Sequence, residues 1–449
     1  MNNSEMKKIP QIDQILGNPH VAHWIEKISR PLTTAAARRA VDHCREKLKS
    51  GQSYDENALF HDIDKVCSNI YSRRIQPVVN ATGVILHTNM GRSPIPEKAW
   101  DRCREINTGY SNLELSLQTG KRGKRNGLVP KFINALTGSE ACAVVNNNAA
   151  AVYLVLCAFA AGREVIVSRG EQVQIGGGFR IPEILALSGA KLVEVGTTNI
   201  TTLDDYLNAV TENTAMVLKV HRSNFAIRGF TSEPGIKELT DALPKGILTV
   251  VDQGSGVLNE SLPGEEKASS LFSDGADLIT FSGDKIIGGP QAGIIAGKKE
   301  LLALIDSHPL IRTMRPGKTI YSLLEAVLLQ RMENPGARSR HSESANSRES
   351  AADKCRKFKR GLSAEKFKII DDTICLGGGS TPDKFFDSKA VEILSEKLKP
   401  ELIIKMLRNA SPPIIGTIRN ERAVINPFVF SDDEMKYVKS VLKEMEDRL

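Results

Sequence analysis

A single lysine, Lys285, stands between a short apolar run and a glycine-rich segment in FSGDKIIGGPQAG (281–293). Lysine is rarely enclosed in a protein unless it is paired or used, and burial lowers the pKa of its amine. Because a neutral amine can attack an aldehyde, this placement predicts a nucleophilic lysine. Ser282, which ends the same apolar run, is predicted to help bind the molecule that carries this aldehyde.

A carboxylate, Asp252, ends another apolar run, ILTVVD (247–252), and a glycine-containing turn follows it. Such a group could pair with a ring nitrogen, bind a metal ion or cap the turn. The eight histidines are scattered, and the pair His20 and His23 has no third ligand at a convenient spacing. A metal site is therefore not expected.

Three asparagines, Asn146, Asn147 and Asn148, follow the run CAVV (142–145) and precede an alanine-rich helix. Main-chain N–H groups at a helix N-terminus, with small polar side chains beside them, form a cradle for a phosphate, although a simple capping turn is the alternative. A phosphate cradle, then an acid, then a lysine is the order expected of an enzyme that holds pyridoxal 5′-phosphate (PLP). The lysine would bind the aldehyde, and the acid would pair with the pyridinium.

Arginines form a fourth group of candidates. Arg92 follows Asn-Met-Gly, and Arg312 and Arg315 flank Thr313-Met314. The planar guanidinium suits oxyanions such as phosphate, and a solvated surface is the alternative.

Short apolar runs that alternate with helical stretches must position these residues. The runs predicted as buried strands are CAVV (142–145), EVIVS (164–168), KLVEV (191–195), AMVLKV (215–220), ILTVVD (247–252), DLITFS (277–282) and AGIIAG (292–297). This alternation predicts an α/β fold with a doubly wound, mostly parallel sheet. Ligands of such sheets bind at the carboxyl ends of the strands, where the candidate residues lie.

The alternation of apolar runs and helical stretches is confined to the middle of the chain. This predicts domains at 1–75, 76–320 and 321–449. Residues 1–75 have the apolar spacing of small amphipathic helices, including a basic one over 31–49 with Thr33 or Thr34 as N-cap and Gly51 past its end.

The last domain is predicted to be a small α+β unit. Its expected strands lie near 369–375, 414–419 and 423–429, and a Ser/Arg-rich patch over 335–350 is expected to form a loop.

Composition limits the class of protein. The chain has 449 residues, of which 41% are hydrophobic and 25% charged, with a net charge of +7, so we expect a soluble globular protein rather than a disordered one. That excess of charge permits nucleic-acid binding without diagnosing it. The longest apolar run, over 149–162, is too short to span a bilayer. The seven cysteines include no C-x-x-C pair, which favours a reducing cytoplasm over a disulfide framework.

These residues carry a resemblance to a known family, the bacterial selenocysteine synthases, or L-seryl-tRNA(Sec) selenium transferases. The matching segments are IPQIDQIL (9–16), VVNATGVILHTNMGR (78–92), YSNLE (110–114), TGSEACAVVNNNAAAV (137–152), GREVIVSRGE (162–171), GGGFRIPEI (176–184), VEVGTTN (193–199), FSGDKIIGGPQAGIIAGKK (281–299), LGGGSTP (376–382) and PPIIG (412–416). They cover nearly the whole chain.

The resemblance implies a PLP enzyme of the aspartate-aminotransferase-like fold, fold type I, with a seven-stranded sheet. By position it makes Lys285 the PLP lysine and Asp252 the partner of the pyridine nitrogen, and it places the asparagines at the phosphate end. It implies that Arg92, Arg312 and Arg315 hold the anion of the selenium donor, selenophosphate. It further implies that the N-terminal domain grips serine-charged tRNA(Sec), and that the chain assembles as a ring of dimers, a decamer, with sites between subunits.

Two other functions remain open from the residues. A PLP-dependent lyase acting on a small phosphorylated amino acid or amino sugar acid would keep the cofactor residues and use the arginines for a substrate phosphate. Such a lyase has no need of a helical N-terminal domain, which favours the tRNA enzyme. A non-catalytic tRNA-binding protein would have no need of the lysine, the acid and the phosphate cradle together.

Overall fold

The computed structural model describes residues 3–175, 178–333, 348–377 and 384–449. The chain divides into two compact units, Met1–Pro77 and Val78–Leu449. Among the described residues, no helix combines the length and the apolar character that crossing a bilayer requires. The seven cysteines are all free thiols.

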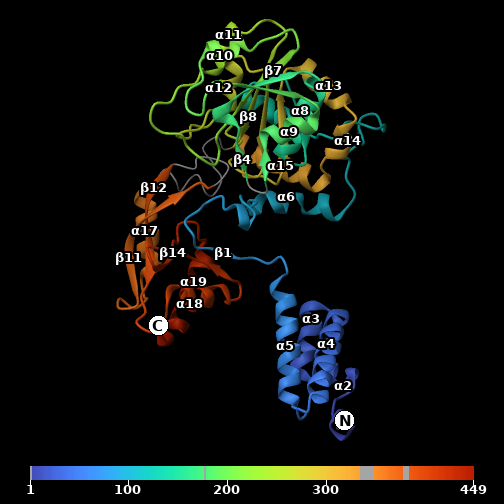
Figure 1. The fold of residues 1–449 in the computed structure, drawn as a ribbon, viewed down its shortest axis with the longest axis vertical. Helices are drawn as coiled ribbons and strands as arrows, with labels where there is room; N and C mark the ends of the chain where they lie inside the picture. Colours follow the sequence, from blue (N-terminus) through green and yellow to red (C-terminus); the bar gives the residue numbers. More distant parts are fainter. Residues whose placement is uncertain (1–2, 176–177, 334–347, 378–383) are drawn as a thin grey trace. The chain divides into compact units, whose positions relative to one another are not determined.

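The first unit is a bundle of short helices (Figure 1). Its helices are α1 (Asn3–Met6), α2 (Ile12–Gly17), α3 (Pro19–Ile28), α4 (Arg30–Lys49) and α5 (Glu56–Ser72). The indole N–H of Trp24 donates to Asp64 at 2.8 Å and so joins α3 to α5. Ile15, Val41 and Ile63 are buried in the same core, so the helical spacing of apolar residues closes this bundle.

The N-terminus of α4 differs from the prediction. Thr33 or Thr34 as the N-cap is wrong, because the N-cap is Ser29 and both threonines lie inside the helix. Each threonine hydroxyl donates at 2.8 Å to the main-chain carbonyl four residues earlier instead of capping an N–H group. The other end is as predicted, since α4 ends at Lys49 and Gly51 follows with φ 95°.

A seven-stranded sheet organises the second unit and confirms the predicted α/β class. Its order is β2 (Ala141–Val145), β10 (Gly293–Gly297), β9 (Leu278–Ser282), β8 (Leu248–Gly254), β7 (Thr214–Val220), β3 (Glu164–Ser168) and β6 (Lys191–Val195). Strand β10 is antiparallel to both neighbours, and every other pairing is parallel. Each apolar run predicted as a strand forms one of these seven.

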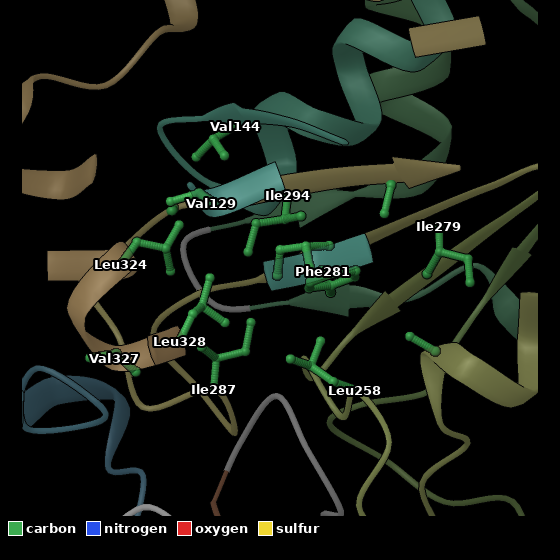
Figure 2. Close-up of a cluster of buried hydrophobic side chains, with 14 of the residues drawn as sticks. Val129, Val144, Leu258, Ile279, Phe281, Ile287, Ile294, Leu324, Val327 and Leu328 are labelled. Atoms are coloured by element: carbon green, nitrogen blue, oxygen red, sulfur yellow. The ribbon is translucent and has the colours of Figure 1, made fainter. Parts of the chain in front are cut away.

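Helices cover both faces of this sheet. They are α6 (Glu97–Thr108), α7 (Val129–Thr137), α8 (Asn148–Phe159), α9 (Ile181–Ser188), α10 (Leu203–Asn208), α11 (Ile236–Ala242), α12 (Ala268–Ser273), α13 (Lys299–Ser307), α14 (Leu310–Met314) and α15 (Lys318–Glu333). Adjacent residues of β10, Ile294 and Ile295, point to opposite faces and belong to two different buried clusters. Figure 2 shows the first cluster, in which Leu324 and Leu328 of α15 accompany Phe281 of β9.

The register of the central strands brings their carboxyl ends to one edge. Val220 of β7 lies opposite Asp252 of β8, and Asp252 lies opposite Thr280 of β9. The residues that follow these strands therefore share a short stretch of that edge.

The remainder of the second unit contains a smaller sheet. Its order is β11 (Phe367–Cys375), β12 (Phe385–Ile393), β15 (Arg422–Ile425) and β14 (Thr417–Arg419), and its helices are α17 (Arg348–Lys359), α18 (Pro400–Arg408) and α19 (Asp432–Met445). Two further short pairs are β1 (Val79–Asn80) with β13 (Ile414–Ile415), and β4 (Gln174–Ile175) with β5 (Phe179–Arg180). The predicted strands near 369–375, 414–419 and 423–429 have counterparts here, whereas β12 was not predicted.

The predicted domain boundary at 320/321 falls inside helix α15 (Lys318–Glu333). The division into three domains stays a prediction. Of the Ser/Arg-rich patch expected to form a loop, residues 335–347 lie outside the described residues, and 348–350 begin α17.

Candidate active site

A pocket of about 530 Å³ lies at the carboxyl edge of the large sheet. Of the residues predicted to form the site, the structure brings six together in its lining: Arg92, Asn147, Asn148, Asp252, Ser282 and Lys285. Phe179 of β5 and the segment Gly289–Gln291 also line it. Residues more than 190 positions apart in the sequence therefore meet in one cavity.

Asp252 is buried near the end of β8, with 4% of its surface exposed. The side-chain amide of Asn148 donates to Asp252 Oδ1 at 2.7 Å, and the hydroxyl of Thr280 donates to the same oxygen at 3.3 Å. Burial raises the pKa of Asp252, and the Asn148 hydrogen bond and the nearby Lys285 oppose that rise. The carboxyl group is thus fixed in orientation, and a cationic N–H group beside it would favour its charged form.

Lys285 follows β9 in a tight turn and is 7% exposed. Burial, together with the positive charge of Arg92, lowers the pKa of Lys285 to about 8. Asp252 and Asp284 oppose this shift. A substantial share of the amine is therefore neutral near physiological pH, which is the form that a nucleophilic lysine requires.

Arg92 reaches the site through an ion pair that the sequence analysis missed. Its Nη1 donates to both carboxylate oxygens of Asp284, at 3.0 and 3.1 Å, and the main-chain N–H of Ser93 donates to the carbonyl of Asp284 at 3.2 Å. Arg92 adopts φ 60° and the preceding Gly91 φ 85°, so the chain turns through left-handed conformations there. The only sequence signal for Asp284 was its position directly before Lys285.

The three asparagines have three different surroundings. Asn147 is the N-cap of α8, and its side chain accepts from the N–H of Ala150 at 2.8 Å. Asn148 holds Asp252, as described above. Asn146 is exposed and is not in the pocket lining, and its main-chain N–H donates to the carbonyl of Met314 at 2.8 Å. Asn147 therefore caps the helix while its neighbour Asn148 fixes Asp252, and a role of the asparagines in binding a phosphate stays a prediction.

Arg312 and Arg315 do not line this pocket. Arg312 is exposed on α14. Arg315 donates to Glu114 Oε1 at 3.3 Å, and Arg125 Nε donates to the same oxygen at 2.7 Å. Glu114 thus pairs with both arginines outside the pocket.

A histidine next to the site also escaped the sequence analysis. His221 follows β7, its main-chain N–H donates to the carbonyl of Asp252 at 2.9 Å, and its Nε2 lies 3.2 Å from Glu265 Oε1. This contact with Glu265 raises the pKa of His221 against the effect of burial. The sequence signal for His221 was its position directly after the apolar run that forms β7.

The pocket suits a flat, phosphorylated cofactor. Two buried atoms of its lining residues, Ser93 Oγ and Asn148 Oδ1, make no hydrogen bond within the described part of the chain. Gly254 adopts φ 68°, and a Cβ at this position would lie 3.7 Å from Lys285 Nζ and 3.8 Å from Asp252 Oδ1. A side chain at this position would contact both the lysine and the aspartate, and the positive φ favours glycine there. The N-terminus of α8 provides N–H groups for an anion at the same pocket.

The fold and the pocket together fit the predicted class, an enzyme that depends on pyridoxal phosphate. A solved structure of D-glucosaminate-6-phosphate ammonia-lyase has a similar fold, with a TM-score of 0.60 and 18% identity over 83% of this chain and 96% of that one.

The comparison of sequences narrows this class. The family model of L-seryl-tRNA selenium transferase matches residues 78–429, and the model of the selenocysteine synthase N-terminal region matches residues 6–45. The L-seryl-tRNA(Sec) selenium transferase of Carboxydothermus hydrogenoformans is 39% identical, covering 98% of this chain and 97% of that protein. The protein of the same name from Aquifex aeolicus is 38% identical, covering 98% and 99%. The chain belongs to the L-seryl-tRNA selenium transferase family.

Proposed function

We propose that this protein converts seryl-tRNA(Sec) to selenocysteyl-tRNA(Sec), with selenophosphate as the selenium donor. The observation that carries the proposal is the single pocket in which Lys285, Asp252 and the Arg92–Asp284 pair meet, in a chain of this family. In the overall reaction the seryl group loses its α-proton and its hydroxyl group as water. Selenium from selenophosphate then adds to the β-carbon, a proton returns to the α-carbon, and the phosphoryl group of the donor passes to water and leaves as phosphate.

The chain's own residues would hold the cofactor at three points. Lys285 would bind its aldehyde carbon, Asp252 its protonated ring nitrogen, and the N-terminus of α8 at Asn147 its phosphate. Bound PLP supplies the electron sink that makes the seryl α-proton acidic. Asn148 and Thr280 support this chemistry because they fix the Asp252 carboxyl group in one orientation.

Lys285 is the natural carrier of the proton. With a pKa of about 8, its amine can accept the α-proton and give a proton back near neutral pH. The walls of the pocket restrict water at this point, since Asp252, Ser282 and Lys285 are each less than a tenth exposed. Asp284 keeps Arg92 beside the amine, and so contributes to the electrostatics of the transfer.

Arg92, Arg312 and Arg315 would bind the donor anion. Arg92 lines the pocket, whereas Arg312 and Arg315 lie outside the lining in a single chain. We therefore place Arg312 and Arg315 at the pocket of a second copy, in keeping with a homo-oligomer built as a ring of dimers. A guanidinium fork can hold an oxyanion through two N–H groups at once.

The helical first unit would bind the tRNA. Its helix α4 carries Arg30, Arg38 and Arg39 around an exposed hollow, and positive charge of this kind contacts phosphates. Serine-charged tRNA(Sec) is the substrate implied, and the cytoplasm is the compartment proposed. A lyase for a small phosphorylated substrate would have no use for this unit.

The test is incubation of the purified protein with seryl-tRNA(Sec) and labelled selenophosphate, with seryl-tRNA(Ser) as the control. Label that appears on tRNA(Sec) alone supports the proposal. No transfer from selenophosphate, together with ammonia or water release from a small phosphorylated amino acid or amino sugar acid, would replace it with the lyase function.

A further inference from the structure

A second pocket, of about 340 Å³, opens at the same edge of the large sheet. Five hydroxyl-bearing residues line it: Ser168, Thr198, Thr201, Thr231 and Ser232. Its charged lining residues, Arg222 and Glu233, satisfy each other through two hydrogen bonds of 2.9 Å. The pocket is thus polar without a net charge, which suits a neutral ligand rich in hydroxyl and N–H groups rather than a bare oxyanion.

The second pocket lies where the topology of the sheet favours ligand binding. Strand β3 ends at Ser168 and its chain continues to β6 on one side, whereas β7 ends at Val220 and its chain continues to β8 on the other side. Ligands of open α/β sheets bind at such a switch of direction. Neighbouring strands lie about 4.8 Å apart, so the ends of β3 and β7 are within about 10 Å of Asp252 on β8.

Hydrogen bonds hold the walls of this pocket in place. The main-chain N–H of Ser232 donates to the carbonyl of Asn199 at 3.1 Å, and that of Thr201 donates to the carbonyl of Ser232 at 2.9 Å. The hydroxyl groups of Ser168 and Thr201 lie 2.7 Å apart, which ties the wall to the end of β3. The pocket is therefore preformed, and little ordering would be needed on binding.

The loop after β7 carries exposed aromatic residues, and its main chain contacts a lining residue of the pocket. Phe230 is 93% exposed and Phe225 is 39% exposed, and Arg228 lies between them in sequence. The side-chain amide of Asn199, a lining residue, donates to the carbonyl of Phe230 at 2.5 Å. Proteins commonly bind single-stranded nucleic acids through exposed aromatic rings near basic residues, because each unpaired base can stack on a ring.

From these observations we propose that this second pocket and Phe230 bind the unpaired 3′-terminal nucleotides of the substrate tRNA. Phe230 stacks against a terminal base, and the hydroxyl groups of the pocket pair with ribose and base edges. The inference rests on the proposed function, because it places the nucleotide next to the esterified seryl group within reach of Lys285. In this proposal the residues at the ends of β3 and β7 and in the loop over 221–233 bind the 3′ end of the tRNA.

The decisive variant is Phe230→Ala in the full-length protein. Because stacking on an aromatic side chain contributes about 1–3 kcal/mol per base, the KM for seryl-tRNA should rise about tenfold, while kcat stays within about twofold. Phe230→Trp should restore the KM. Phe385 is also an exposed phenylalanine, 61% exposed on β12 of the small sheet, so Phe385→Ala is the matched control and should leave the KM unchanged.

A binding comparison ties the effect to the 3′ end. The wild-type protein should bind uncharged tRNA less tightly once the unpaired terminal nucleotides are removed, whereas Phe230→Ala should bind the full and the shortened tRNA equally. The proposal would be overturned if Phe230→Ala had the KM of the wild type. It would also be overturned if Phe230→Ala lost as much affinity as the wild type when the tRNA is shortened. A changed oligomeric mass of Phe230→Ala would also overturn it, because Phe230 would then be a contact between copies.

These outcomes separate the two proposals. If the wild-type protein forms selenocysteyl-tRNA and Phe230→Ala behaves like it, the proposed function stands and the subsite fails. If the wild-type protein forms none, the proposed function fails, and the binding comparison still decides the subsite because it requires no turnover.

Discussion

The pKa of Lys285 determines how readily the apo-protein captures pyridoxal phosphate, and capture can be followed by the visible absorbance of the lysine-bound cofactor. Burial and Arg92 lower this pKa from 10.5 to about 8. At pH 7 about one tenth of the amine is then neutral, against about one part in three thousand for an ordinary lysine. The structure therefore predicts a neutral fraction about 300-fold above that of an unperturbed amine, which corresponds to about 3.4 kcal/mol, and capture should be faster by up to that factor.

The sign of the pH dependence follows from the charge on the amine. Since only the neutral form attacks the aldehyde, capture should be slow at low pH and should rise to a plateau with a midpoint near pH 8. Arg92→Gln should move the midpoint upward, because it removes a cation and leaves Asp284 to stabilise the charged amine. Asp252→Asn should move it downward, because it removes a carboxylate that favours the charged form.

The assay is stopped-flow absorbance of apo-protein mixed with PLP between pH 6 and pH 10. Arg102→Gln is the matched control, since Arg102 pairs with Glu333 at 3.5 Å outside the pocket lining, and its midpoint should equal that of the wild type. A wild-type midpoint above pH 10 would refute the reasoning from burial. A downward shift in Arg92→Gln would refute the assigned role of that cation.

Four further outcomes are expected. Lys285→Ala should lose the visible absorbance of the lysine-bound cofactor while its circular dichroism stays unchanged. Asp252→Asn should keep PLP bound, measured by equilibrium dialysis, but should lower turnover by several orders of magnitude because the electron sink is weakened. Arg312→Ala or Arg315→Ala should still exchange the seryl α-hydrogen with solvent deuterium but fail to transfer selenium. The corresponding Arg→Lys variants should recover part of the selenium transfer. Deletion of residues 1–77 should leave PLP binding intact and weaken both the affinity for seryl-tRNA and its dependence on salt, measured by filter binding at two salt concentrations.

The sheet was predictable because its strands are short apolar runs that end in polar or glycine residues. Burial on both faces makes such runs nearly continuous, and this pattern is visible in sequence. Strand β12 (Phe385–Ile393) was missed because it mixes polar and apolar residues, as in FFDSKAVEI. The cap of α4 was missed because a threonine near a helix start can donate backward as readily as it can cap.

The site was predictable where a residue follows a strand. Lys285, Asp252 and Asn148 lie at strand ends, so the sheet itself brings them together. The Arg92–Asp284 pair was not predictable in this way, because it joins positions 192 residues apart through loops whose path has no periodic signal. The same reason applies to Arg315, whose contact with Glu114 depends on how two loops meet.

The backbone conformation at Arg92 is costly for a residue other than glycine. At φ 60° an arginine occupies a conformation that glycine adopts at lower cost, and residues held there store of the order of 1 kcal/mol or more. A sequence optimised only for folding stability would place glycine at position 92, as it does at Gly91. If Arg92 binds the donor anion as proposed, Arg92→Gly would relax the backbone and remove that contact, so a search for thermostable variants could select against the proposed function.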